Sequence, residues 1–312
     1  AKEKDVKKVE DCLQAQHSFS FDVKSMNSAI ANHLSDDFNY IGFACGFIVF
    51  FFLWLSMGSI ELAVLSFIPM AISWLWILGL MAIFHMQFNI VNIILATFIF
   101  GQGDDYTIFM TEGAMYEYAY RRKMLASYKH SIIISALIMF IGIGTLIVAR
   151  HPALRSLAEV TIAGMFSVVL MAYIFPPLIF NWLVKHKGEY RVRPLSLQML
   201  FRRRKEGVAY YHDLVLDRYR YKGVEVFSTV KRNLRRNRDY QAWMEQQDTS
   251  LPVIIPSAGY GEKVLLFALL HPETKVIAVE ADPDKCRLMK FSMEGIVENV
   301  EIINQAEISR QM

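Results

Sequence analysis

The sequence predicts an α-helical membrane bundle of five transmembrane helices, followed by a partial cytoplasmic α/β domain. Residues 39–184 consist mainly of long apolar runs, whereas the segments on either side have the composition of soluble protein. A helix needs about 20 apolar residues to cross a bilayer, and the runs are of that length. From Leu251, strand-like and helix-like segments alternate around a glycine-rich turn, a pattern typical of α/β folds.

Composition divides the 312 residues into four segments. We expect the end of an external (periplasmic) domain at 1–38, the transmembrane domain at 39–187, a basic cytoplasmic linker with a helical lead-in at 188–250, and a truncated α/β domain at 251–312. The chain starts without Met and stops before an α/β domain would be complete, so we expect a piece of a longer protein. The three cysteines are Cys12, Cys45 and Cys286. Their spacing is typical of neither a disulfide nor a metal site, so the sequence predicts no metal site.

The five spans are predicted at Asn39–Ser56, Ile60–Phe84, Phe88–Ala114, Ser131–Ala149 and Leu157–Val184. Only three residues separate the first two spans, which should therefore form a tight helical hairpin. Proline inside the second and fifth spans should kink those helices, since proline removes a backbone hydrogen bond.

Basic residues predict the orientation of the bundle, because Lys and Arg accumulate in cytoplasmic loops. They occur between spans three and four and directly after span five, at Arg121, Arg122, Lys123, Lys129, Lys185, Lys187, Arg191 and Arg193. Arg150 and Arg155 on the opposite side weaken this asymmetry slightly. Residues 1–38 should then lie outside and the C-terminal half inside the cell.

The third span contains the acidic motif Gly101-Gln102-Gly103-Asp104-Asp105-Tyr106. The apolar run Ile90–Phe100 is too short to cross alone, so the helix must continue through the acids. A charge at that depth costs at least ~2.5 kcal/mol and typically marks an ion or proton pathway. The alternative places the acids at headgroup level, which would bury four polar side chains instead: His85, Gln87, Asn89 and Asn92.

Helical spacing places Gly101 and Asp105 on one face, where glycine lets another helix approach closely. Tyr106 offers a hydroxyl beside the Asp105 carboxylate, whereas Asp104 faces about 100° away and should lie nearer water. Burial and hydrogen bonding act in opposite directions on a carboxylate's affinity for protons, so Asp105 could exchange a proton between the two sides. Hydroxyl side chains of the fourth and fifth spans should donate hydrogen bonds within their own helices. These residues are Ser131, Ser135, Thr145, Thr161 and Ser167. Ser135 and Thr161 are alternative members of the relay.

The Gly-x-Gly-x-Asp-Tyr motif in the third of five closely spaced spans resembles the resistance-nodulation-division (RND) superfamily, specifically its MMPL-type exporters of hydrophobic or lipid cargo. The resemblance covers about residues 20–187. It implies twelve spans in two repeats, of which these five would be the last, so that the chain would hold half of an RND-type repeat architecture.

The same resemblance implies that Asp105 and Tyr106 form a proton relay with a matching pair in the missing N-terminal half. Protons would be the coupling ion, and membrane lipids and a hydrophobic small-molecule or lipid cargo the partners, in the bacterial inner membrane. The family usually carries an apolar residue where this chain has Asp104, so Asp104 is a possible second proton site.

Between Lys185 and Tyr240 there are 16 Lys or Arg against 6 Asp or Glu. Anionic lipid attracts such juxtamembrane clusters by about 1 kcal/mol per charge, which predicts docking on the inner leaflet. A solvated linker is the alternative. We expect no nucleic-acid partner, because the tyrosines of this stretch form no recognisable nucleic-acid-binding module.

The α/β segment should contain a strand at Val253–Ile255, a glycine turn, a helix at Glu262–Leu270, a strand at Lys275–Glu280 and a helix at Asp282–Val297. An acid that ends the second strand, about 20 residues after the turn, can hold ribose hydroxyls.

This segment is similar to the start of Rossmann-like S-adenosylmethionine-dependent methyltransferases over about residues 215–305. The similarity implies that Ser257, Gly259 and Gly261 line the cofactor and that Glu280 binds its ribose. Ile255 stands where an acid is usual, and Ser257 where the first glycine is usual. A degenerate, non-catalytic domain is therefore an equal alternative.

Three functions remain open from sequence. The first is a proton-driven exporter of a hydrophobic or lipid-like substrate that carries a methyltransferase-like domain. The second is a membrane-tethered S-adenosylmethionine-dependent methyltransferase acting on a lipid-soluble substrate. The third is a sterol-sensing-type module that binds lipid and regulates without pumping.

Overall fold

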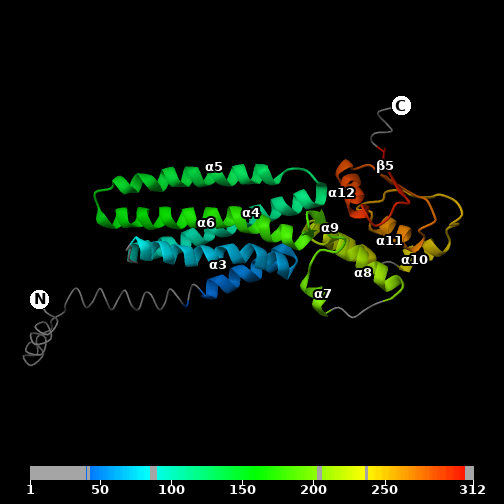
Figure 1. Ribbon diagram of the computed structural model, residues 1–312, viewed down its shortest axis with the longest axis horizontal. Coiled ribbons are helices and arrows are strands. Elements are labelled where there is room, and N and C mark those ends of the chain that lie inside the picture. The colour runs from blue at the N-terminus through cyan, green and yellow to red at the C-terminus, as the bar shows by residue number, and fades with distance from the viewer. Residues whose placement is uncertain (1–39, 41–42, 85–89, 202–205, 236–237, 306–312) are drawn as a thin grey trace, which may run out of the picture.

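The computed structural model describes residues 40, 43–84, 90–201, 206–235 and 238–305. The external segment predicted at 1–38 lies outside these residues. The molecule is elongated, with a helical bundle at one end and a smaller domain of helices and strands at the other (Figure 1).

Among the residues that the structure describes, the bundle consists of five helices. A helix at Phe43–Met57 is followed by α3 (Ile60–Ile83), α4 (Ile90–Tyr120), α5 (Leu125–Gly144) and α6 (Pro152–Val184). A short 3-10 helix, η1 (Thr145–Val148), extends α5. Helix α6 packs against α3, α4 and α5 and so forms the centre of the bundle.

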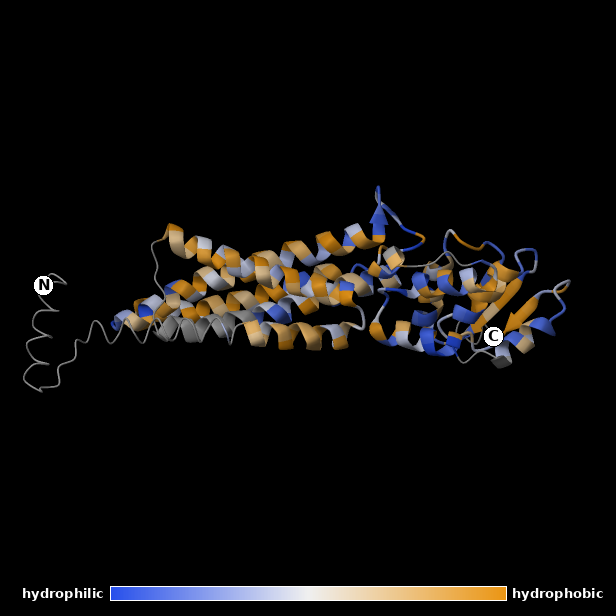
Figure 2. Cartoon of the chain, turned by 90° about the horizontal axis from the view of Figure 1, so that it is seen from below, coloured by the Kyte–Doolittle hydropathy of each residue, from blue (hydrophilic) through white to orange (hydrophobic). Residues whose placement is uncertain are grey.

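Three helices of the described residues are long and apolar enough to cross a membrane, namely Ile60–Ile83, Leu125–Val148 and Pro152–Val184. Five spans were predicted, so the number of described helices that meet this measure differs from the prediction. The helix at Phe43–Met57 is apolar but too short within the described residues. Helix α4 has 31 residues, but the polar side chains of its second half interrupt its apolar character. Figure 2 shows hydrophobic residues along the helices of the bundle.

The predicted hairpin between the first two helices is confirmed. Gly58 turns the chain with φ +64, a left-handed conformation that favours glycine. A Cβ atom at Gly58 would lie 3.2 Å from a methyl group of Val224, so the turn also fits closely against the C-terminal domain. Ser59 caps α3, its hydroxyl accepting a bond from the backbone N–H of Leu62 at 3.3 Å.

The C-terminal domain begins with an antiparallel pair, β1 (Lys185–His186) and β2 (Glu189–Tyr190). Four helices follow: α7 (Leu197–Phe201), α8 (Val208–Tyr219), α9 (Val224–Arg235) and α10 (Arg238–Glu245). The last part is β3 (Val253–Ile255), α11 (Glu262–Leu270), β4 (Val276–Glu280), α12 (Pro283–Met293) and β5 (Val300–Asn304).

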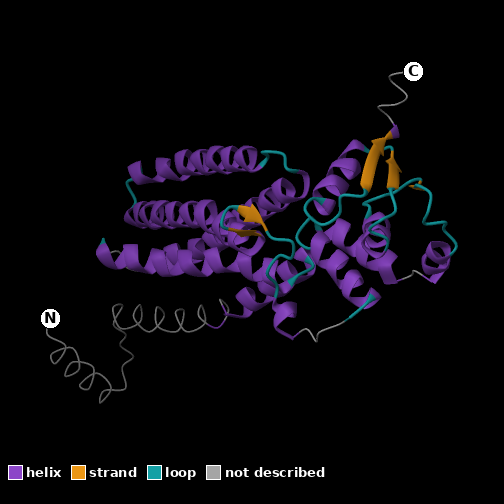
Figure 3. Ribbon diagram, turned by 45° about the vertical axis from the view of Figure 1, so that its right-hand side comes forward, coloured by secondary structure: helices purple, strands orange, loops and turns teal. Residues whose placement is uncertain are grey.

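The three C-terminal strands are parallel and adjacent in the order β3-β4-β5 (Figure 3). Val253 pairs with Val276, which pairs in turn with Val300. The predicted strand at Val253–Ile255 and helix at Glu262–Leu270 are confirmed, and β5 is an addition. Ile254 is 59% exposed, so one face of the sheet is not covered by the described residues.

The helices predicted as a lead-in to the α/β unit share its hydrophobic core. Val215 of α8 and Val230 of α9 are fully buried in one cluster with Phe267 of α11 and Val276 of β4. Residues on both sides of the boundary expected at residue 250 therefore contribute to one hydrophobic cluster. Three basic residues of the stretch predicted to face the leaflet, Arg218, Arg220 and Lys222, are also buried.

Candidate functional sites

The acidic motif lies in the middle of α4, and its two carboxylates differ in environment. Asp105 is exposed, whereas Asp104 is half-buried. The buried Oδ1 atom of Asp104 has no hydrogen-bond partner among the described residues. Sequence spacing predicted that Asp104 would lie nearer water than Asp105; here Asp105 is the more exposed of the two.

Tyr106 points into the bundle and is 4% exposed. Its hydroxyl lies 3.2 Å from Oγ of Ser135 on α5 and donates a bond to Oε1 of Gln102 at 3.4 Å. Neighbouring residues on a helix point about 100° apart, so Tyr106 and Asp105 face different surroundings. The structure therefore places Tyr106 beside Ser135. Among the described residues, no hydrogen bond connects Tyr106 with Asp105.

Glycine allows a close helix contact at Gly103 rather than at Gly101. A Cβ atom at Gly103 would lie 3.1 Å from a methyl group of Val168 on α6, whereas one at Gly101 would meet nothing within 4 Å. The motif thus packs one side of α4 against α6, and Gly101 on the other side has no close neighbour among the described residues.

An exposed stripe, which we call the open face of α4, runs along this free side. It contains Gly101, Asp105, Phe109 and Glu112, all exposed and spaced by three or four residues. Glu112 was missed in the sequence analysis, which considered only the motif. Its position seven residues after Asp105 places both carboxylates on one face.

Most hydroxyls of the bundle bond to their own helix, as predicted. This is confirmed for Ser131, Thr145, Thr161 and Ser167, each of which donates to a backbone carbonyl three or four residues earlier. Among the five hydroxyls of the prediction Ser135 is the exception, because its hydroxyl meets Tyr106 across the α4–α5 contact. The structure therefore favours Ser135 over Thr161 as a neighbour of the motif.

The glycine turn follows β3, where three residues have positive φ. These are Ser257 at +52, Gly259 at +61 and Gly261 at +83. A Cβ atom at Gly261 would clash with the side chain of Met289, so glycine there allows α11 and α12 to pack closely. Ser257 is exposed and adopts a conformation that costs a non-glycine residue about 1–3 kcal/mol.

Glu280 ends β4 with its carboxylate turned toward the glycine turn. One oxygen accepts a bond from the backbone N–H of Gly259 at 2.7 Å. The other accepts from Ala281 at 3.0 Å and Asp282 at 3.2 Å. Glu280 thus holds the turn together, and its remaining acceptor capacity is what a ribose hydroxyl could use.

A polar junction joins the bundle to the domain that contains the glycine turn. Arg122, just after α4, pairs with Asp284 of α12 at 2.8 Å. The guanidinium of Arg121 lies 3.3 Å from the ring centre of Tyr190 and pairs with Glu294 at 3.6 Å. The helix that carries the carboxylates therefore contacts the helix that follows Glu280.

Two buried cations complete this junction. Arg218 donates to the backbone carbonyls of Ser292, Arg191, Phe291 and Glu294. Lys222 donates to Oγ of Ser292 at 2.7 Å. Burial, together with the nearby cations Arg218 and Arg121, holds the pKa of Lys222 well below its usual value. Sequence analysis counted both residues as part of a membrane-facing charge and so missed their role.

A bundle of apolar helices, three of them long and apolar enough to cross a membrane, defines a helical membrane protein. The model of the MMPL family matches residues 23–208, and the chain belongs to this family. Comparison with curated proteins and with solved structures finds no match. The family match ends at the start of α8, so the comparisons do not support the methyltransferase resemblance.

Proposed function

We propose that this chain is the membrane part of a proton-motive-force-driven exporter of a hydrophobic or lipid-like substrate in the bacterial inner membrane. Family membership supports a membrane exporter in general. The observation that carries the proton coupling is the position of Asp105, which lies in mid-helix on the open face of α4. An ionisable group at that depth is costly in lipid and needs a partner.

In this proposal the Asp105 carboxylate takes up a proton from the external side and releases it toward the cytoplasm. The neutral acid is compatible with close contact to another helix, and the anion requires water or a polar partner. This difference lets protonation bias two arrangements of the bundle. Gly101, one turn earlier on the same face, leaves room for the approaching helix.

The partner at the open face would be the N-terminal half implied by the family resemblance, with its own Asp-Tyr pair. Tyr106 then acts from the side of α4 that faces the bundle interior, because its hydroxyl is held there by Ser135 and Gln102. Asp104 is the alternative proton site, since its unpaired Oδ1 can accept a hydrogen bond.

The proposed orientation places the C-terminal domain in the cytoplasm. The turn at Gly58 and the segment at Arg121 contact this domain, and the β1–β2 hairpin begins it directly after α6. All three follow predicted outside-to-inside crossings, and their position at one end of the bundle supports that assignment (Figure 1).

Reconstitution of the full-length protein tests proton coupling. Liposomes would contain a pH-sensitive dye and a fluorescent lipid analogue, and a proton gradient would be imposed. We expect the gradient to drive movement of the analogue and a protonophore to abolish it. Movement or binding of the analogue that is indifferent to the gradient would contradict the pump and favour a lipid-binding module.

A methyltransferase-like activity of the C-terminal domain is the second candidate, favoured by the glycine turn tied to Glu280. Ser257, Gly259 and Gly261 would line S-adenosylmethionine, and Glu280 would bind its ribose. Isothermal titration of the full-length protein should show binding, weakened about tenfold or more in Glu280→Gln. Exposed Glu298 offers the matched control Glu298→Gln. Absence of binding to the unaltered protein would eliminate this candidate.

A further inference from the structure

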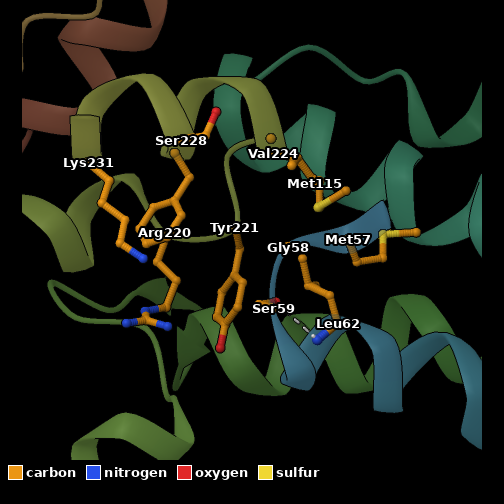
Figure 4. A pocket seen from close by; sticks show the side chains of 12 residues that line it. Met57, Gly58, Ser59, Leu62, Met115, Arg220, Tyr221, Val224, Ser228 and Lys231 are labelled. Atoms are coloured by element: carbon orange, nitrogen blue, oxygen red, sulfur yellow. Dashed lines mark hydrogen bonds between the residues drawn. The ribbon is translucent and has the colours of Figure 1, made fainter. Parts of the chain in front are cut away.

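A cavity of about 140 Å³ lies where the bundle meets the C-terminal domain. Its walls come from the turn between the first two helices, from α4, and from the segment that leads into α9. Figure 4 shows apolar side chains on one side, among them Met57, Leu62 and Met115, and the cations Arg220 and Lys231 on the other. The cavity is therefore amphipathic.

Arg220 contributes a buried cation that keeps one donor unused. It is 5% exposed and donates to Oε1 of Gln198 at 2.7 Å. Its guanidinium also forms ion pairs with the carboxylates of Glu61 at 3.9 Å and Asp217 at 3.7 Å, both longer than a hydrogen bond. The Nε atom is buried without a hydrogen-bond partner among the described residues. Since buried donors are nearly always paired, this donor indicates an acceptor that is still to be supplied.

Lys231 adds a second positive charge at the rim. Its side chain is exposed, and it makes no ion pair with any described residue. Helix α9 begins at Val224 on the same rim, and its first backbone N–H groups have no acceptor within the helix. The charge of Lys231, the unpaired Nε of Arg220 and a helix N-terminus together favour an anion.

The opposite wall indicates what is attached to that anion. Met57 and Leu62 belong to the ends of the helix at Phe43–Met57 and of α3, and both are buried. Just outside the turn, Leu55 and Ile60 are exposed, as expected for side chains in contact with lipid. The cavity thus lies at the cytoplasmic edge of the proposed membrane region, beside apolar surface.

We propose that this cavity binds the phosphate headgroup of an anionic membrane lipid, with the glycerol against the methionine wall. Arg220 and Lys231 would contact the phosphate, and the acyl chains would lie along the exposed apolar side chains. Basic pockets at this level of a membrane protein suit such headgroups. The bound lipid would join the bundle to the C-terminal domain, independently of the proton relay.

The test is native mass spectrometry of the full-length protein in detergent, titrated with phosphatidylglycerol. We expect retention of bound lipid, reduced about fivefold in affinity in Lys231→Gln. Ser228→Phe would fill the cavity mouth from an exposed position without removing a charge, and it should reduce binding similarly. Lys290→Gln removes an exposed lysine of α12 outside the cavity and should have no effect.

Two further arms separate the lipid from other anions. Glycerol phosphate and inorganic phosphate lack acyl chains and should displace the lipid only weakly. Displacement by inorganic phosphate at concentrations equal to those of the lipid would overturn the proposal in favour of a free-phosphate site. Unchanged lipid retention in both cavity variants would overturn it as well. Neither result depends on a proton gradient, so failure here is distinct from failure of the pump.

Discussion

Replacement of Asp105 by asparagine in the full-length protein is expected to reduce gradient-driven export to the level of protein-free liposomes. Asparagine has nearly the same shape and can form hydrogen bonds, but it cannot take up or release a proton. The open face of α4 would keep its form, because Asp105 makes no contact with the described residues that the change would break. The loss would therefore report on proton transfer itself, measured as dye response and lipid movement in the same liposomes.

Glu112→Gln provides the matched control for this experiment. Glu112 lies on the same open face and undergoes the same chemical change, yet it stands about 10 Å nearer the end of α4. Export close to that of the unaltered protein is expected. Equal losses in both variants would mean that the charge of the face matters and not the particular carboxylate.

The adjacent residues decide which carboxylate carries the proton. Asp104→Asn should lower export less than Asp105→Asn, since Asp104 is half-buried against the bundle. Tyr106→Phe removes one hydroxyl that lies 3.2 Å from Ser135 and should slow export without abolishing it. Full loss in Asp104→Asn with export retained in Asp105→Asn would reassign the proton site.

Replacement of Arg218 by methionine is expected to produce the largest loss of stability. The arginine is 4% exposed and satisfies three backbone carbonyls around the end of α12 and a fourth, that of Arg191. Each buried carbonyl left unpaired costs about 1–3 kcal/mol. Burial lowers the pKa of Arg218, and this desolvation cost offsets part of the gain. We therefore expect a net loss of about 3 kcal/mol, less than the sum of the four bonds.

Thermal unfolding and hydrogen exchange of the full-length protein would measure this effect. A loss of about 3 kcal/mol corresponds to a decrease in Tm of about 6–12 °C for a unit of 150–250 residues. Protection of backbone amides should fall around Arg191 and at the end of α12. Arg287→Met, which changes an exposed arginine of the same helix, should leave both measurements unchanged. An unchanged Tm in Arg218→Met would show that the junction does not depend on this side chain.

Local patterns in the sequence predicted the elements that depend on neighbouring residues. Apolar runs predicted the helices, and a glycine turn between apolar segments predicted the strand at Val253–Ile255 and the helix at Glu262–Leu270. The number of spans was overestimated, because the first run is short in the described part and polar residues interrupt α4. The family resemblance was supported by the match over residues 23–208, and the methyltransferase resemblance was not.

The sequence by itself determined the membrane character of the chain, the acidic motif in a long helix and the order of the α/β elements. These follow from hydrophobic periodicity and turn chemistry within a few residues of each position. Only the tertiary structure decided that Asp105 is on the open face, that Tyr106 meets Ser135, and that Arg218 is buried at the junction. These features depend on contacts between distant segments, such as that of Arg218 with Ser292, 74 positions away. A charge count treats Arg218 and Lys231 alike, whereas packing buries one and leaves the other at the rim of a cavity.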